Sequence, residues 1–289
     1  MAITNFIPQL WAAGIFKALE RNQTWTQAGV VNRDYEGIIS QAGDSVKINS
    51  LGDVTIQDYT GTLADPQELT DSSQILTIDQ QKAFNFKIDD IDKAQASENL
   101  MVEAARKAAR ALNEQAGLFV SNLALGAHTD NVLGTAAAPL TNIDKNTAYE
   151  FLTELKKRLD DKGVPSEGRW IQSPGWFTAI LLNAKILSDT NMSQIIVNGK
   201  IGRVAGFDII EAPVVPTATG AGGPSDVIVA GHSLAISFAE QIVKTEAYRP
   251  EKSFADALKG LHVYGGKLVR PEAVTITYAK GTSGAFATA

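Results

Sequence analysis

The clearest pattern in the chain is an alternation of apolar and polar residues across residues 46–91. It runs through four short segments, at residues 46–48, 54–56, 76–78 and 84–88. A period of two is typical of half-buried antiparallel strands, so the pattern predicts an extended hairpin with a turn at residues 50–53. A two-stranded ribbon is only marginally stable by itself in water. We therefore expect the hairpin to lie on another surface.

The strongest helical pattern covers residues 97–125. Its apolar residues recur in steps of three and four along one face, at Leu100, Ala104, Ala108, Leu112, Ala116, Phe119 and Leu123. Ser97 is a suitable N-cap, and Gly126 is a suitable end. At ~1.5 Å per residue the helix would be roughly 40 Å long, far longer than the average helix of ~11–12 residues. The pattern predicts a rod that crosses a flat molecule.

Residues 140–279 show a mixture of short helices and strands. Thr147 and Glu150 have the spacing of a capping box at the start of one helix, and Ser173 with Pro174 starts a second helix. Strand-like runs occur at residues 170–172, 204–210, 226–230, 234–238, 261–264 and 274–278, and a short helical segment occurs at residues 254–258. No fixed-period repeat is present, so this part predicts one mixed fold.

The N-terminal segment, residues 2–31, carries large apolar side chains that include Trp11, Phe16 and Trp25. No local core is evident to receive them. A terminus of this kind must dock on something, because otherwise it would fray. Two interpretations are open: the segment packs on its own domain, or it is an arm that docks on a neighbouring subunit.

Composition narrows the class of protein. Of 289 residues, 44% are hydrophobic and 20% are charged, which is ordinary for a globular chain with a substantial core. The net charge of −6 argues against a protein that reads nucleic-acid sequence, because such proteins carry a basic stripe. The absence of cysteine excludes disulfides and thiolate chemistry. No apolar run approaches the ~20 residues that span a bilayer, and we expect no signal peptide.

Residues with catalytic chemistry are scattered along the sequence. His128, His232 and His262 have no partners at metal-ligand spacing, and no serine lies in a G-x-S-x-G sequence. The glycine-rich residues 219–223 lack the lysine and the following helix of a phosphate-binding loop, so they predict a hairpin loop. We therefore predict no catalytic residues and no cofactor, and we do not expect an enzyme.

Asp89, Asp90 and Asp92 form an acidic cluster. Carboxylates are ligands for hard cations such as calcium, but Lys93 follows where another oxygen ligand would help, and no glycine permits the turn of an EF-hand. We interpret the cluster as the end of a strand, with Asp92 near the positive N-terminal end of the long helix. No metal site is predicted.

Several segments, taken in order, resemble the major capsid proteins of tailed bacteriophages, the family with the HK97-type fold. The segments are VNRDYE (31–36), GDSVKI (43–48), FNFKIDD (84–90), IGRVAGF (201–207) and LHVYGGKLVRPE (261–272). Each is weakly specific by itself, whereas their order around one hairpin and one long helix is considerably more specific.

The resemblance implies an α+β fold, the HK97-like capsid fold. Residues 1–35 would form an N-terminal arm, and residues 36–92 would form an extended hairpin loop that lies over a neighbouring subunit. Residues 93–139 and 246–289 would form a peripheral domain with the long helix as its spine. Residues 140–245 would form an axial domain whose loops meet around symmetry axes.

The function implied by the resemblance is that of a coat protein. It would self-assemble into an icosahedral phage head that encloses double-stranded DNA without sequence specificity, and it would be found in the virion after assembly in the host cytoplasm. Its partners would be copies of itself in hexamers and pentamers, a portal, and a separate scaffolding protein, since the chain lacks the long helical extension of some relatives. No membrane partner is expected.

Some relatives cross-link their subunits through lysine and asparagine. Neither Lys47 nor Lys82 can be aligned to a reacting lysine, so no cross-linking is predicted. Two alternatives stay open: an encapsulin-like nanocompartment subunit, and a soluble α/β metal-binding module that uses the acidic cluster.

The subunit interface is predicted from the apolar residues of the two thin segments, which bury too little surface alone. The residues concerned are Trp11, Phe16 and Trp25 in the arm, and Val54, Ile56 and Tyr59 in the hairpin.

Overall fold

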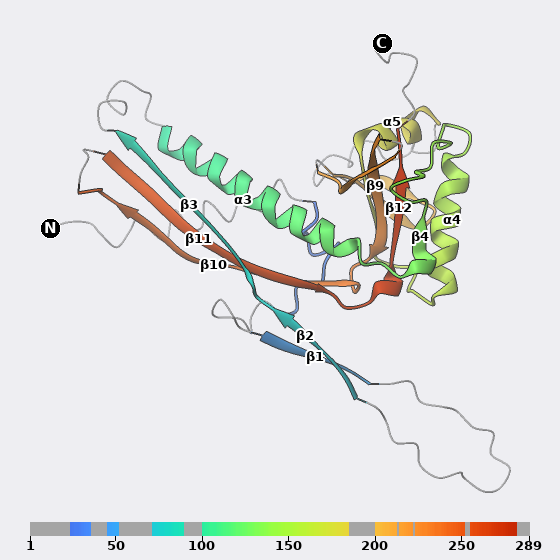
Figure 1. Ribbon diagram of the computed structural model, residues 1–289, viewed down its shortest axis with the longest axis horizontal. Helices are drawn as coiled ribbons and strands as arrows, with labels where there is room; N and C mark the ends of the chain where they lie inside the picture. Colours follow the sequence, from blue (N-terminus) through green and yellow to red (C-terminus); the bar gives the residue numbers. More distant parts are fainter. Residues whose placement is uncertain are drawn as a thin grey trace, which may run out of the picture.

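The molecule consists of an elongated lobe, a compact lobe and a narrow ribbon that projects from the elongated lobe (Figure 1). The computed structural model describes residues 24–35, 45–51, 71–89, 100–184, 200–212, 214–221, 223–251 and 255–281. The three parts follow from three separate β-sheets.

The elongated lobe is a three-stranded antiparallel sheet with one long helix lying along it (Figure 1). The strands, in spatial order, are β10 (Ile236–Tyr248), β11 (Ala255–Leu268) and β3 (Gln80–Asp89), and the helix is α3 (Leu100–Ala124). The rings of Phe119 on α3 and Tyr264 on β11 meet edge to face, with their centroids 5.4 Å apart. Small buried residues such as Ala109 and Ala116 give α3 a narrow packing face.

The compact lobe is a seven-stranded mixed sheet with two helices. The path through the sheet is β4 (Val132–Leu133), β12 (Val274–Ala279), β9 (Gly223–His232), β5 (Arg169–Ser173), β7 (Phe207–Glu211) and β6 (Lys200–Val204), and β8 (Thr217–Gly220) pairs with β9. The helices α4 (Ala148–Asp161) and α5 (Gly175–Asn183) bury Leu155 and Phe177 against Ile171 and Ile209 of the sheet. Short 3-10 turns lie at Thr129–Asn131 and Pro271–Ala273.

One hydrophobic core joins the two lobes. It contains Val120 from α3, Phe238 and Tyr264 from the elongated sheet, and Trp170 and Ile276 from the compact sheet. Because side chains from both lobes fill the same cluster, the lobes form one packed body.

The ribbon consists of β1 (Ser45–Leu51) and β2 (Asp71–Thr77), which pair antiparallel from Ser45 opposite Thr77 to Leu51 opposite Asp71. This register confirms an extended hairpin. The prediction of a turn at residues 50–53 is wrong for Ser50 and Leu51, because both residues belong to β1.

Most other expected elements are present with changed limits. The long helix is α3, and residues 97–99 lie outside the described residues. The strands expected at residues 170–172, 226–230 and 274–278 are parts of β5, β9 and β12. The helix expected after Ser173 and Pro174 is α5.

Three local expectations are wrong. Residues 255–258 begin β11 rather than a helix, because strands β3 and β10 pair with them on both sides. The single strand expected at residues 204–210 is instead the hairpin of β6 and β7, whose turn residues Ala205 and Gly206 have φ angles of 51° and 90°. Thr147 makes no side-chain cap to α4; its hydroxyl oxygen instead accepts from the backbone N–H of Asp144 at 2.9 Å, and the hydroxyl donates to the carbonyl of Asn142.

The sheets group the chain differently from the expected domain limits. Strand β3 lies within residues 36–92, which were expected to form the hairpin loop, and β10 begins within residues 140–245. Both strands pair with β11, so the elongated lobe draws its sheet from three of the expected parts.

Candidate functional site

The base of the ribbon lies on the elongated sheet. Val46, Leu76 and Ile78 form a buried cluster with Ala239 of β10 and Val263 of β11. Leu76 is completely buried. The ribbon is therefore attached to its own subunit by a small apolar contact at one end.

Gly265 sets how closely the chain between β2 and β3 can cross β11. A Cβ atom placed on Gly265 would lie 2.2 Å from the carbonyl oxygen of Thr77 and 2.8 Å from the Cα atom of Ile78. Any side chain would collide with backbone, so only glycine permits the crossing. This contact fixes the point at which the ribbon leaves the lobe.

The ribbon also carries an exposed apolar side chain. Ile75, opposite Lys47 in the ladder, keeps 52% of its surface exposed. Val54, Ile56 and Tyr59 lie outside the described residues, so their predicted role in an interface stays a prediction.

Residues 24–35 form a segment docked on the body of the molecule. Trp25 is completely buried, meets the ring of Trp170 edge to face at 6.1 Å, and donates from Nε1 to the carbonyl oxygen of Val214 at 2.7 Å. The sequence predicts Trp25 at a subunit interface, whereas in the structure its side chain fills the core of its own chain. Of the two interpretations of the N-terminal segment, packing on its own domain holds for this part. Trp11 and Phe16 lie outside the described residues.

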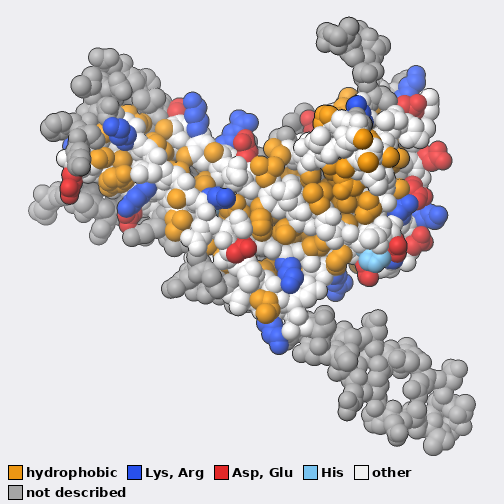
Figure 2. Space-filling view, viewed as in Figure 1, with side chains coloured by type: hydrophobic (Ala, Val, Ile, Leu, Met, Phe, Trp, Pro, Cys, Tyr) orange, Lys and Arg blue, Asp and Glu red, His pale blue; other side chains and the backbone are white. Residues whose placement is uncertain are grey.

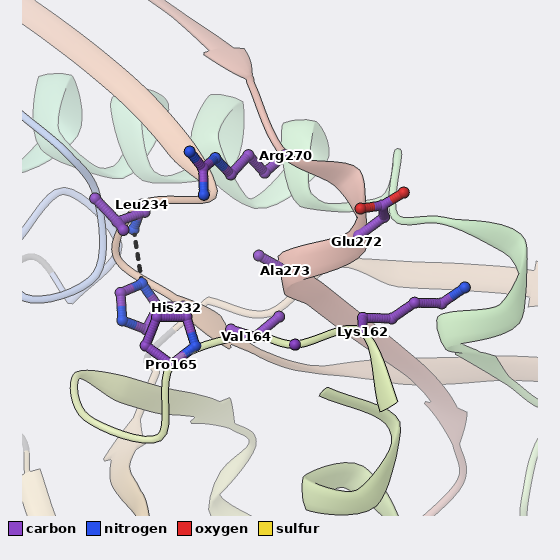
Figure 3. Close-up of a pocket in the computed structure, with 9 residues that line it drawn as sticks. Lys162, Val164, Pro165, His232, Leu234, Arg270, Glu272 and Ala273 are labelled. Carbon is purple, nitrogen blue, oxygen red and sulfur yellow. Dashed lines mark hydrogen bonds between the residues drawn. The ribbon is translucent and has the colours of Figure 1, made fainter. Parts of the chain in front are cut away.

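A pocket lies where the end of α4 meets the start of β12 (Figure 3). Its volume is about 80 Å³, and its lining includes Lys162, His232, Arg270 and Glu272. Pockets that hold cofactors or drug-sized ligands usually have volumes of roughly 300–1,000 Å³. This pocket is therefore too small for such a ligand.

His232 is the buried titratable group of that pocket. Burial lowers the pKa of His232, and the nearby charges of Arg169 and Arg270 act in the same direction. Its Nδ1 accepts a hydrogen bond from the backbone N–H of Leu234 at 3.1 Å. These contacts keep the ring neutral and hold the turn after β9, which is a structural role.

The other residues that were weighed for chemistry do not converge. His128 lies 3.4 Å from Asp130, whereas His262 lies inside the elongated lobe beside Glu240. Asp89 ends β3 opposite Ala255, and Asp90 and Asp92 lie outside the described residues.

No group of three or more metal-ligating side chains occurs within the described ranges. Gly220 and Gly223 pair at the end of the β8–β9 ladder, which confirms the predicted hairpin at this place in the chain. In the part of the chain that the structure describes, no helix is both long and apolar enough to cross a membrane.

Charges of both signs are interspersed on the surface. Figure 2 shows Lys, Arg, Asp and Glu side chains mixed along the elongated lobe, with no broad basic stripe on this face. On α3, for example, Arg110 pairs with Glu114 at 3.0 Å. Such a face does not resemble a surface that reads nucleic-acid sequence.

The sequence patterns did not predict two features of the structure. One is the close approach at Gly265, for which the available signal is a glycine inside a strand pattern. Arg33 and Glu240 form a partly buried ion pair, which no periodic signal marks because the two residues are 207 positions apart.

The long helix over a thin sheet, the compact mixed lobe and the projecting ribbon together define the HK97-type fold of shell-forming capsid subunits. A sequence model of the family described as phage capsid protein matches residues 72–277. The match extends over more than half of the chain, so the chain belongs to this family. It is a major capsid protein of a tailed bacteriophage, and its place is the virion shell.

Solved structures of phage particles share the fold. A chain from Mycobacterium phage Che8 is 27% identical with a TM-score of 0.68, and the alignment covers 96% of this chain and 93% of that one. A chain from the capsid of cyanophage P-SCSP1u is 15% identical with a TM-score of 0.66, covering 92% of this chain and 88% of that one.

A virus-like particle from Pyrococcus furiosus also has the fold. Its chain is 12% identical with a TM-score of 0.55, and the alignment covers 94% of this chain and 99% of that one. No protein with a curated description matches the chain. The family match favours a phage capsid over the two alternatives, a nanocompartment subunit and a metal-binding module.

Proposed function

We propose that copies of this capsid protein form hexamers and pentamers that close into an icosahedral head. A portal and a separate scaffolding protein take part in assembly, which occurs in the host cytoplasm, and the finished shell encloses double-stranded DNA. The observation that supports this proposal is the projecting ribbon. A two-stranded ribbon has little stability of its own, and in its described residues the buried apolar contact with its own subunit lies at the base.

The parts of the chain have distinct roles in this proposal. Residues 1–23 act as the arm, and the ribbon of β1 and β2 carries the extended loop. The elongated lobe is the peripheral domain and includes β3 and β10, while the compact lobe is the axial domain. Residues 24–35 belong to the body of the subunit, since Trp25 lies in its core.

The association energy comes from apolar side chains of the thin segments. We keep Trp11, Phe16, Val54, Ile56 and Tyr59 as proposed interface residues. Burial of apolar surface contributes roughly 25 cal/mol per Å², and a closed shell repeats each modest contact many times.

The capsid protein contributes geometry and performs no catalytic step in this proposal. The net charge of −6 and the mixed surface charges keep free subunits soluble. They also make contact with packaged DNA weak and independent of its sequence.

The arm is tested with the double variant Trp11→Ala, Phe16→Ala. Shell yield should fall at least about tenfold, because the loss of roughly 1.5–3 kcal/mol per large side chain recurs at every subunit contact. Yield is measured by sedimentation and electron microscopy, and the thermal midpoint of the free subunit should be unchanged.

The matched control is Thr4→Ala, Gln9→Ala, which alters polar residues of the same arm and should leave yield intact. Normal shells from the Trp11→Ala, Phe16→Ala variant would refute the role of the arm.

A further inference from the structure

Three side chains from distant parts of the sequence meet inside the elongated lobe. They are Arg33 from the docked segment, Glu240 from β10 and His262 from β11. The side chain of Glu240 is only 12% exposed, and that of His262 is 1% exposed. A buried carboxylate needs partners for its charge, and Arg33 and His262 are those partners here.

The cluster lies where residues 24–35 run along β10. The backbone N–H of Asn32 donates to the carbonyl of Ile236 at 2.8 Å, and the N–H of Phe238 donates to the carbonyl of Asn32 at 2.9 Å. Two hydrogen bonds make a short bridge, not a strand. The next residue, Arg33, adds an ion pair to Glu240, and its guanidinium lies 5.8 Å from the ring centroid of Phe238.

Both oxygens of the Glu240 carboxylate are engaged. Oε1 accepts from Nη2 of Arg33, and Oε2 lies 3.2 Å from Nε2 of His262. A carboxylate can only accept, so Nε2 of His262 carries the proton. The buried Nδ1 of His262 has no hydrogen-bond partner among the described residues. The negative charge of Glu240 thus faces the positive charge of Arg33 directly.

We propose that Glu240 is a charge-dependent latch that holds residues 24–35 on the elongated sheet. The latch fixes the place from which the arm starts on one side and from which the chain passes to the ribbon on the other. It operates within one subunit, so it does not depend on what the arm contacts.

Because the contact depends on the charge of Glu240, its strength changes with pH. Burial acts to raise the pKa of Glu240, but the hydrogen bond from His262 and the charge of Arg33 outweigh it and hold the pKa below the ordinary value of 4.5. A lowered carboxyl pKa stabilises the folded contact fully above about pH 4.5, and this stabilisation is lost as the pH falls through the folded pKa.

Among the described residues, the charged groups nearest Glu240 come from three elements. The docked segment contributes Arg33, β11 contributes His262 with the phenol of Tyr264 on the same face of the strand, and β3 contributes Lys82, which lies opposite His262. Burial raises the pKa of Tyr264, so the phenol stays neutral throughout the acid range. The buried side chains of α3, within its described part, carry no charge.

The test is hydrogen exchange of the full-length chain, followed by mass spectrometry and corrected for the intrinsic exchange rate at each pH. The variant Glu240→Gln keeps the size of the side chain and removes its charge. Protection of the amides of Asn32 and Phe238 should fall about tenfold or more at pH 7 in this variant. Wild-type protein should lose the same protection only in acid, below about pH 4.5.

A matched control is Glu246→Gln, which removes a more exposed ion pair with Lys259, 2.9 Å long, between the same two strands. It should leave the protection of residues 24–35 unchanged. The variant Arg33→Gln removes the other charge of the latch and should reproduce the loss, with α4 still protected as a check on folding. Wild-type protection at Asn32 in both Glu240→Gln and Arg33→Gln would overturn the proposal, as would an unchanged acid response in Glu240→Gln.

Discussion

At the scale of single residues, the capsid subunit depends on contacts that join segments far apart in the sequence. Trp25 packs on Trp170, and Gly265 permits the backbone near Thr77 to cross β11. Each contact holds a thin segment against the body.

The variant Gly265→Ala should destabilise the subunit by about 1–3 kcal/mol or more, because its Cβ would lie 2.2 Å from a carbonyl oxygen that cannot easily move. Thermal or urea unfolding of the free subunit measures the change. The control is Gly29→Ala, where nothing lies within 4 Å of the added atom, and a change within about 0.5 kcal/mol is expected. Equal stability of the two variants would contradict the role given to Gly265.

Residue-scale chemistry was only partly predictable from the sequence. The sequence indicated that His128, His232 and His262 would not share a site; His128 contacts Asp130, His232 lines the pocket, and His262 contacts Glu240. It could not indicate the partnership of Glu240 with Arg33, because an ion pair between residues 207 positions apart depends on how the strands are placed in space.

At the scale of elements, the periodicity of the sequence predicted the helix and strands that depend only on local spacing. A long run of helical spacing predicted α3, and alternation predicted the ribbon strands and β3. Alternation does not specify which strand pairs with which, so β3 was assigned to the hairpin although it pairs with β11. The turn at Ala205 and Gly206 was missed because alanine rarely adopts a positive φ.

The attachment of the ribbon gives a prediction at this scale. Leu76→Ala should destabilise the free subunit by about 2–5 kcal/mol, because Leu76 is completely buried between ribbon and sheet. Ile75→Ala, one residue earlier and 52% exposed, should change the stability by less than about 0.5 kcal/mol. Chemical unfolding of the purified subunits measures both values. A large loss from Ile75→Ala, or none from Leu76→Ala, would mean that the ribbon packs by its other face.

At the scale of the whole molecule, the two lobes share one hydrophobic core and form a single building unit of the shell. The chain belongs to the phage capsid protein family, and the resemblance seen in ordered sequence segments is confirmed by the family match across residues 72–277. Composition and periodicity alone did not specify a shell, since an acidic α+β chain without catalytic motifs fits many functions. Assembly depends on contacts between subunits, and those contacts use surfaces that stay exposed in a single chain.

Electron microscopy of the purified full-length protein, under conditions that drive assembly, tests the central claim most directly. We expect closed particles of uniform outline, built from many copies of this chain. A population that stays monomeric and compact under every such condition would contradict a shell held together by its projecting segments.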